Sequence, residues 1–164
     1  MRERKINRMK GFDYKTPGYY YITICTKDRK EWFGKMDGRK VVLNSFGTIV
    51  EKHWVDLPHH YVPIELDEYI IMPNHLHGII KINVGNGLKP FPTHIYSLSE
   101  VIRGFKTFSS KEIRILNQNF RWQKSFYDNI IRTEYSLQKI REYIRWNPLK
   151  WDIDPENKEV TVSR

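Results

Sequence analysis

Short runs of β-branched and aromatic residues recur along the chain and predict the strands of a sheet. The run at 19–26, YYYITICT, follows Pro17-Gly18 and has the composition of a central strand. Two later runs are separated only by Pro73-Asn74, which predicts a tight turn because both residues favour turn geometry. The predicted strands are residues 19–26, 40–43 (after a turn at Asp37-Gly38), 64–72 and 75–84, with one more short strand within 120–131.

Between these runs, apolar residues recur at intervals of three and four and predict three helices. The first helix begins at residue 44 or 45 and ends at Pro58. The second follows a capping box at 97–100, and the third stops before Pro148. The inward positions are Phe46, Ile49, Val50, Trp54 and Leu57 in the first helix, Leu98, Val101, Ile102, Phe105 and Phe108 in the second, and Leu137, Ile140 and Ile144 in the third, which Thr133 opens.

The order of these elements predicts one α+β domain around a mainly antiparallel sheet. Close hairpins alternate with helices, which favours a layered α+β structure. A length of 164 residues suits a single domain. We expect a basic arm at residues 1–10, the folded domain at 11–154 and a tail at 155–164, with a flexible loop at 85–92.

Composition and charge exclude several classes of protein. A hydrophobic content of 40% argues against a disordered chain, and the single cysteine, Cys25, excludes a disulfide scaffold. We find neither an apolar run long enough to span a membrane nor the apolar stretch of a signal peptide, so we expect a soluble protein of a reducing compartment. The net charge of +9 indicates an anionic partner, most commonly nucleic acid. In the basic arm, Arg2, Arg4 and Lys5 are candidate phosphate contacts.

His75 and His77 are the first candidates for chemistry. Side chains alternate along a strand, so these two imidazoles project to one face while Leu76 points to the other. Neutral imidazoles on a rigid strand can share a divalent metal, although a further ligand must come from elsewhere. The alternative is two surface histidines on a half-exposed strand.

Tyr143 and Asn147 form a second candidate pair. They lie one helical turn apart, beside the apolar stripe of the last predicted helix. The amide oxygen of Asn147 can bind a metal, which would place Tyr143 near the same ion. The alternative is a boundary aromatic followed by an Asn-Pro helix stop.

Other residues allow more than one interpretation. Glu65, Asp67 and Glu68 precede the histidine strand, and one of them is a further candidate for contacting a metal through water. Arg103 and Lys106 are candidate phosphate contacts on the second helix, or parts of a solvated face. Trp122 is suited to stacking on unpaired bases, but core packing explains it equally well.

Taken together, these motifs resemble a known family. The segments MPNHLHG at 72–78, WQKSFYDNIIR at 122–132 and YIRWNP at 143–148 are similar to those of the HUH single-tyrosine transposases. The match is best with the REP-associated tyrosine transposases and the related small insertion-sequence transposases. It extends from about Gly11 to Trp151 and includes the GYYYITICT strand.

The resemblance implies a fold, a reaction and roles for individual residues. The family fold is ferredoxin-like, with a central antiparallel sheet and helices on one face. Its members cleave single-stranded DNA next to a hairpin and form a 5′-phosphotyrosine, using Mg²⁺ or Mn²⁺. His75 and His77 match the histidine pair, Tyr143 the nucleophile, and Asn147 the position where an amide completes the metal site.

The resemblance also bears on partners. It implies single-stranded DNA with hairpin ends as the substrate, a bacterial cytoplasm as the location, and either a monomer or a homodimer, because insertion-sequence members exchange their catalytic helices between subunits. A different class of function also fits a ferredoxin-like sheet, namely a non-catalytic module that binds single-stranded nucleic acid. The hallmark strand of RNA-recognition domains is absent from the sequence. A zinc-dependent hydrolase would need a larger set of spaced ligands, which we do not find.

Overall fold

A computed structural model describes residues 9–83, 94–154, 156 and 157, and its centre is a four-stranded antiparallel sheet. Every neighbouring pair of strands in this sheet is antiparallel. The strand order is β4-β5-β1-β6. The strands are β1 (Gly18–Cys25), β4 (Ile64–Met72), β5 (His75–Ile82) and β6 (Tyr127–Ile131). This arrangement confirms the expected α+β class and its mainly antiparallel sheet.

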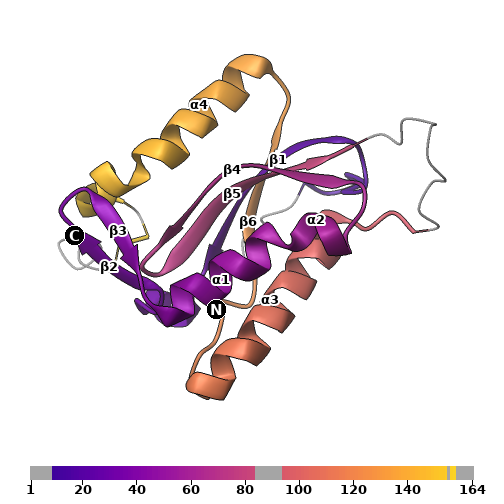
Figure 1. Ribbon diagram of the computed structural model, residues 1–164. Coiled ribbons are helices and arrows are strands. Elements are labelled where there is room, and N and C mark those ends of the chain that lie inside the picture. The colour runs from indigo at the N-terminus through magenta and orange to yellow at the C-terminus, as the bar shows by residue number, and fades with distance from the viewer. Residues whose placement is uncertain (1–8, 84–93, 155, 158–164) are drawn as a thin grey trace, which may run out of the picture.

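Helices cover both faces of this sheet (Figure 1). The helices α1 (Ser45–Val55) and α3 (Leu98–Leu116) lie on one face and enclose the larger hydrophobic cluster. The helix α4 (Glu134–Trp146) lies on the opposite face over a smaller cluster. The expectation of helices on one face is therefore correct for α1 and α3 and wrong for α4.

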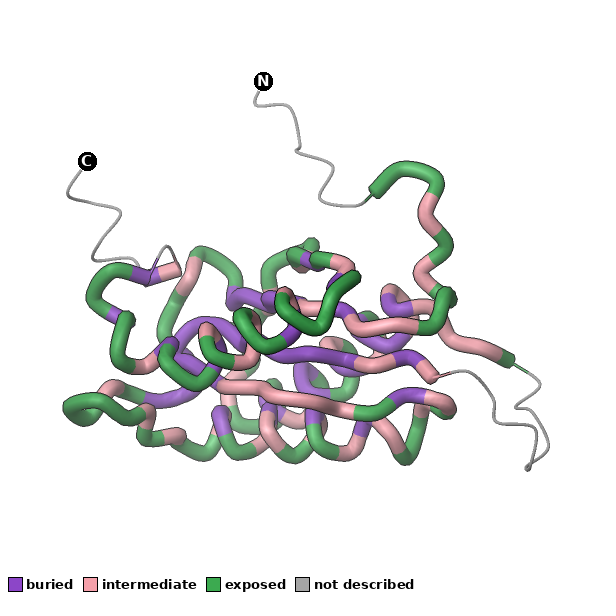
Figure 2. Tube along the Cα trace, turned by 90° about the horizontal axis from the view of Figure 1, so that it is seen from above, coloured by how far each residue is buried: buried purple, intermediate pink, exposed green. Residues whose placement is uncertain are grey.

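The composition of β1 explains why both faces are covered. Its residues Tyr20, Ile22 and Ile24 belong to the cluster under α1 and α3. Its odd-numbered residues Tyr19 and Tyr21 pack with the residues of α4. A strand with large side chains on both faces needs a cover on each side. The buried segments accordingly concentrate in the central strands, and exposed residues lie mostly on helices and turns (Figure 2).

The predicted helix starts are confirmed by their caps. The side chain of Asn44 accepts a hydrogen bond from the Gly47 amide at 3.0 Å. Ser97 and Glu100 form a reciprocal capping box before α3. Thr133 caps α4 by accepting from the Ser136 amide at 3.1 Å. These contacts satisfy amides that would otherwise lack a partner within the helix.

Both helices end before the prolines expected to stop them, and each proline also lies in the first turn of a short helix. The helix α1 ends at Val55, before Pro58, which lies in the first turn of α2 (Leu57–His60). Pro148 lies in the first turn of the 3₁₀ helix η2 (Asn147–Ile153), which continues from α4. Proline is tolerated in a first turn because its missing N–H has no helical partner there.

Several other details differ from the expectations. The hairpin partner of β3 (Lys40–Leu43) is β2 (Gly34–Asp37), whose short polar sequence gives no strand signal. A short 3₁₀ turn, η1 (Lys27–Arg29), follows β1. The side chain of Phe108, expected to face inward, is 58% exposed. The expected loop at 85–92 lies outside the described residues.

Gly78 on β5 allows a helix to pack closely on the sheet. A Cβ atom built at this position would lie 2.4 Å from Cζ2 of Trp54 in α1. Trp54 is fully buried and belongs to the cluster under α1 and α3. Close packing of Trp54 therefore explains the glycine at position 78, independently of any role of the histidines beside it.

The packed structure continues beyond residue 154, where we expected a tail to begin. The backbone oxygen of Glu156 accepts a hydrogen bond from Nδ2 of Asn74 at 2.8 Å, and Asn157 is buried. Arg2, Arg4 and Lys5 of the basic arm lie outside the described residues. Among the helices that the structure describes, none is both long and apolar enough to cross a bilayer.

Candidate active site

The strand β5 brings His75 and His77 to the face of the sheet that α4 covers. His77 is paired with Thr23 of β1 and His75 with Cys25, while Leu76 between them enters the cluster on the other face. Both histidines are almost fully buried. This burial contradicts the alternative of two surface histidines on a half-exposed strand.

The hydrogen bonds of Asn74 fix the orientation of His75. The amide nitrogen of Asn74 donates to the backbone oxygens of Arg29 and Glu156, at 3.1 and 2.8 Å. Its Oδ1 therefore faces Nδ1 of His75, at 2.7 Å. An amide oxygen only accepts, so His75 carries its proton on Nδ1 and keeps the lone pair of Nε2 available.

His77 is oriented by two hydroxyl groups. Its Nδ1 lies 2.8 Å from Oγ1 of Thr23 and 2.8 Å from the hydroxyl of Tyr21. Hydroxyl groups can donate or accept, so this environment permits a proton on Nδ1 of His77 and a free lone pair on Nε2. The two Nε2 atoms lie 3.0 Å apart, close enough for one cation to contact both candidate ligand atoms.

Asp154 and Asn147 complete this cluster from the segment after α4. The ligand atoms of His75, His77 and Asp154 all lie within 4.8 Å of one another. Nδ2 of Asn147 donates to Oδ2 of Asp154 at 2.8 Å. The amide of Glu156 donates to the other carboxylate oxygen at 2.7 Å. Both Asn147 and Asp154 are buried.

This donor set fits a divalent cation. Among the residues that the structure describes, none forms a hydrogen bond with the buried Oδ1 of Asn147, which is costly for an amide oxygen unless something else binds it. Adjacent ligands of an octahedral site, each about 2.1 Å from the metal, lie about 3.0 Å apart. This separation agrees with the 3.0 Å between the histidine Nε2 atoms. Two neutral nitrogens, a carboxylate and an amide oxygen suit a borderline or hard cation.

Burial keeps both histidines neutral. Desolvation lowers the pKa of His75 to about 3. Desolvation, followed by the proximity of His75, lowers the pKa of His77 well below its ordinary value. Neutral imidazole is the form that binds metals.

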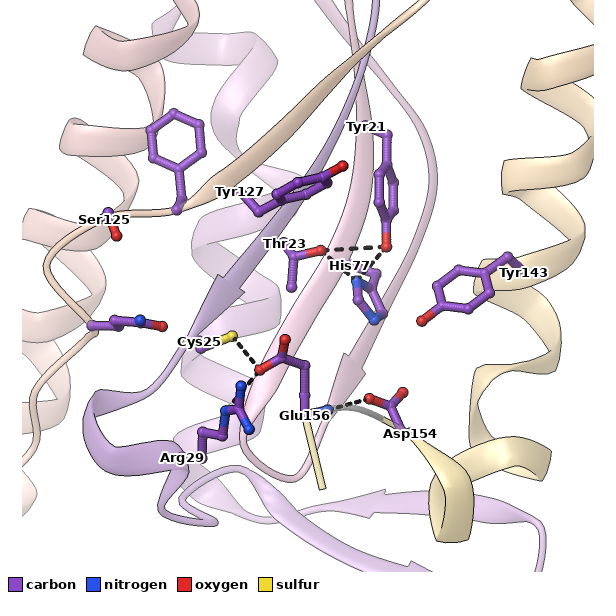
Figure 3. A pocket seen from close by; sticks show the side chains of 12 residues that line it. Tyr21, Thr23, Cys25, Arg29, His77, Ser125, Tyr127, Tyr143, Asp154 and Glu156 are labelled. Carbon is purple, nitrogen blue, oxygen red and sulfur yellow. Dashed lines mark hydrogen bonds and ion pairs between the residues drawn. The ribbon is translucent and has the colours of Figure 1, made fainter. Parts of the chain in front are cut away.

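Tyr143 points from α4 toward this cluster. Its ring centroid lies 5.4 Å from that of His77, and its hydroxyl is directed at the histidine side of the pocket (Figure 3). Burial raises the pKa of Tyr143 to about 12, and the negative charges of Asp154 and Glu156 add to the effect. The phenol is therefore protonated at neutral pH, and a nearby cation would favour its phenolate form.

Two ion pairs hold α4 against β4 of the same chain. Arg141 donates to both carboxylate oxygens of Asp67, at 2.9 and 2.6 Å, and Arg145 donates to Glu68. These contacts assign Asp67 and Glu68 to helix anchoring, and Glu65 pairs with Lys81. The acidic member of the site is Asp154 instead of a residue of this trio.

The site opens into a cavity of about 340 Å³ between α4 and the chain segment that leads into β6. Tyr21, Tyr127 and Tyr143 all line it, and Ser125 lies on the wall opposite α4 (Figure 3). Elsewhere in the lining, Nε of Arg29 lies 3.0 Å from a carboxylate oxygen of Glu156, to which the thiol of Cys25 also donates. The half-buried phenol of Tyr143 thus borders this cavity.

The side chains predicted to contact DNA on α3 and at position 122 do not line the cavity that contains Tyr143. Arg103 is exposed on α3, away from the histidines, and Lys106 is bound to backbone oxygens of the segment before β6. The ring of Trp122 packs between Phe33, Phe105 and Phe120, and its Nε1 donates to Ser109. Trp122 is thus explained by core packing.

Sequence reasoning missed Asp154, Asn74, Thr23 and Tyr21 as parts of the site. Asp154 follows a 3₁₀ helix, so its spacing from Asn147 matches no α-helical or strand period. Asn74 stands next to the histidines in the sequence, which is the one local signal for its role. Thr23 and Tyr21 lie opposite them only through the pairing of β1 with β5.

Comparisons with known proteins show the family to which the sequence is similar. A sequence model of the family described as "Transposase IS200 like" matches residues 15–147. An uncharacterized protein of Haemophilus influenzae is 34% identical over 164 residues, covering 92% of this chain and 91% of its own length. A candidate REP-associated tyrosine transposase of the same organism is 23% identical, covering 84% of this chain and 74% of its own length.

Two solved structures share the fold. One is a REP-associated tyrosine transposase bound to a REP hairpin, with a TM-score of 0.60 and 18% identity over 87% of this chain and 72% of its own. The other is a candidate transposase from Deinococcus radiodurans, with a TM-score of 0.50 and 16% identity over 84% of this chain and 96% of its own.

Proposed function

Because the chain belongs to the IS200-like transposase family, we propose that it cleaves and rejoins single-stranded DNA through Tyr143. The substrate would be a strand next to a hairpin, and the product a 5′-phosphotyrosine. The hairpin-bound relative of the same fold supports a folded DNA end as the partner.

One observation carries this proposal. The phenol of Tyr143 and the imidazole of His77 line one cavity, and Nε2 of the buried His75 lies 3.0 Å from Nε2 of His77, although Tyr143 and the two histidines come from distant parts of the chain. All three groups belong to a single chain whose helix α4 is anchored to its own sheet. We therefore propose that one subunit forms the whole site.

The residues that would hold a divalent cation, Mg²⁺ or Mn²⁺, are His75, His77 and Asp154, with the amide oxygen of Asn147 as a further ligand. A cation there would offset charge on the phosphate oxygens and polarise the scissile bond. Asn147 would also orient Asp154, since its Nδ2 already donates to that carboxylate. Asn74, Thr23 and Tyr21 would hold the imidazoles in place.

The chemical step is a transesterification in which Tyr143 is the nucleophile. Its oxygen attacks phosphorus, the bond to the 3′-oxygen of the preceding nucleotide breaks, and a Tyr143–phosphate ester forms. The phenol proton leaves to water in the cavity, and the departing 3′-oxygen takes a proton from water. A 3′-hydroxyl of another strand reverses the step and releases Tyr143, so rejoining requires no ATP.

A covalent trapping assay tests the proposal. The protein is incubated with Mn²⁺ and labelled hairpin-bearing strands taken from the DNA that flanks its gene. We expect an adduct that resists SDS and is lost in Tyr143→Phe. Tyr135→Phe is the matched control, because Tyr135 is 74% exposed on the same helix and does not line the cavity. Tyr127→Phe controls for a second tyrosine of the cavity wall.

The same assay separates the enzyme from a binding module. An enzyme should lose the adduct in EDTA and after His75→Ala. Absence of any adduct, together with DNA binding that is unchanged in EDTA and after His75→Ala, would contradict strand cleavage and indicate a non-catalytic module.

A further inference from the structure

Two cavities adjoin the segment at residues 123–126, which leads into β6. The cavity that contains Tyr143 shares Ser125 and Phe126 with a second cavity of about 360 Å³ beside α3. We call this second cavity the α3 groove. Because the two have lining residues in common, they lie next to each other, one on the side of Tyr143 and the other beside α3.

The α3 groove is basic, whereas the cavity at Tyr143 is not. Arg103 and Lys106 of α3 and Lys124 of the facing segment line the groove, against one carboxylate, Glu100. Glu100 is engaged in the helix cap, where it accepts from the amide and hydroxyl of Ser97, both at 2.8 Å. In the other cavity, the charge of Arg29 is opposed by Asp154 and Glu156.

Lys106 fixes the shape of the wall between the two cavities. Its ammonium group donates to the backbone oxygens of Gln123 and Ser125, at 2.8 and 2.9 Å. The wall is thus attached to α3 and holds Phe126 at the junction. The Phe126 ring is half-buried, with part of its surface packed on the main cluster and part lining both cavities.

We propose that the α3 groove binds the single DNA strand that flanks the scissile phosphodiester. Arg103 and Lys124 contact consecutive phosphates from opposite walls of the groove, and Phe126 stacks on a base at the junction with the Tyr143 cavity. Basic grooves combined with aromatic platforms are the usual means of holding unpaired strands without reading their sequence. This inference rests on the proposed function for one point, that the phosphodiester next to the bound strand is cleaved at Tyr143. Binding of the strand in the α3 groove does not depend on cleavage.

An anisotropy titration tests strand binding separately from cleavage. The probe is a labelled, mixed-sequence single strand of about 20 nucleotides, longer than typical site sizes. Full-length protein is titrated in EDTA at several salt concentrations. The variants are Arg103→Ala/Lys124→Ala and Phe126→Leu. The control is Arg39→Ala/Lys139→Ala, which removes the same charges at exposed positions that line none of these cavities.

Each part of the groove has its own expected signature. Losing two phosphate contacts should reduce the slope of log K against log salt by about 1.4, at about 0.7 per contact for single strands. Phe126→Leu should weaken binding at least about fivefold while leaving the slope unchanged, since stacking is not ionic. The control pair should leave the slope near that of the wild type.

Three results would overturn the inference. The first is an equal loss of slope in the control pair, which would indicate general charge attraction. The second is unchanged binding in Phe126→Leu. The third is displacement of the strand by a poly-glutamate peptide as readily as by unlabelled DNA, which would indicate a site for acidic protein segments. A wild-type protein that binds through the groove but forms no covalent adduct would refute only the proposed function.

Discussion

Replacing Arg141 with methionine should weaken the attachment of α4 to β4 without removing any member of the candidate site. The guanidinium makes two charge-assisted hydrogen bonds to Asp67, and the two side chains are only 22% and 16% exposed. Methionine keeps the apolar stem but leaves the carboxylate with the amide of Glu68 as its remaining partner. Hydrogen bonds to charged groups contribute about 1.5–3 kcal/mol, so we expect a loss of about 2 kcal/mol.

Thermal unfolding followed by circular dichroism measures this loss. For a chain of this length, about 2 kcal/mol corresponds to a fall in Tm of about 4–8 °C. Lys139→Met is the control on the same helix, because Lys139 contacts exposed groups, the carboxylate of Glu142 and the ring of Tyr135. We expect less than about 2 °C from the control. Equal effects of the two substitutions would refute the anchoring role.

The pH dependence of stability provides an independent check on the pair. Arg141 lowers the pKa of Asp67 from its ordinary 3.8. The stabilisation is therefore complete above that value and is lost as the pH falls through the lower pKa of the folded protein. Wild type should exceed Asp67→Asn in stability at pH 6, and the difference should shrink as the pH falls below about 3.8. A difference that stays constant with pH would contradict the ion pair.

Three further predictions concern other features. Asp154→Asn should lower Mn²⁺ affinity at least about tenfold with little change in fold, and calorimetric titration that finds equal affinity would remove Asp154 from the site. Gly78→Ala should cost about 1–3 kcal/mol in urea unfolding, because its methyl group would overlap Trp54, and a neutral result would contradict that packing. Ser97→Ala should cost about 1 kcal/mol through the lost α3 cap, whereas unchanged thermal unfolding would show that the cap is dispensable.

Local signals in the sequence predict much of the fold. Caps at Asn44, Ser97 and Thr133 fix where helices begin, because each satisfies amides of its own helix. The turn at Pro73-Asn74 likewise positions the histidine strand. Helix ends are harder to predict, since Pro148 is compatible with both a stop and the first turn of a new helix.

The candidate site is predictable only where its members share one element. His75 and His77 follow from strand alternation, and Tyr143 with Asn147 from the helical period. Asp154 is brought in by a 3₁₀ segment that no periodic pattern reveals. Local signals do not show on which face of the sheet each helix packs, because tertiary packing determines this.

Peptide mapping of the trapped adduct tests the central claim most directly. After incubation with Mn²⁺ and a cleavable strand, trypsin should release residues 142–145, EYIR, between Arg141 and Arg145. The account predicts that mass spectrometry finds a 5′-linked nucleotide on Tyr143 within this peptide. A nucleotide on the peptide that contains Tyr127 or Tyr21, with 142–145 unmodified, would contradict it.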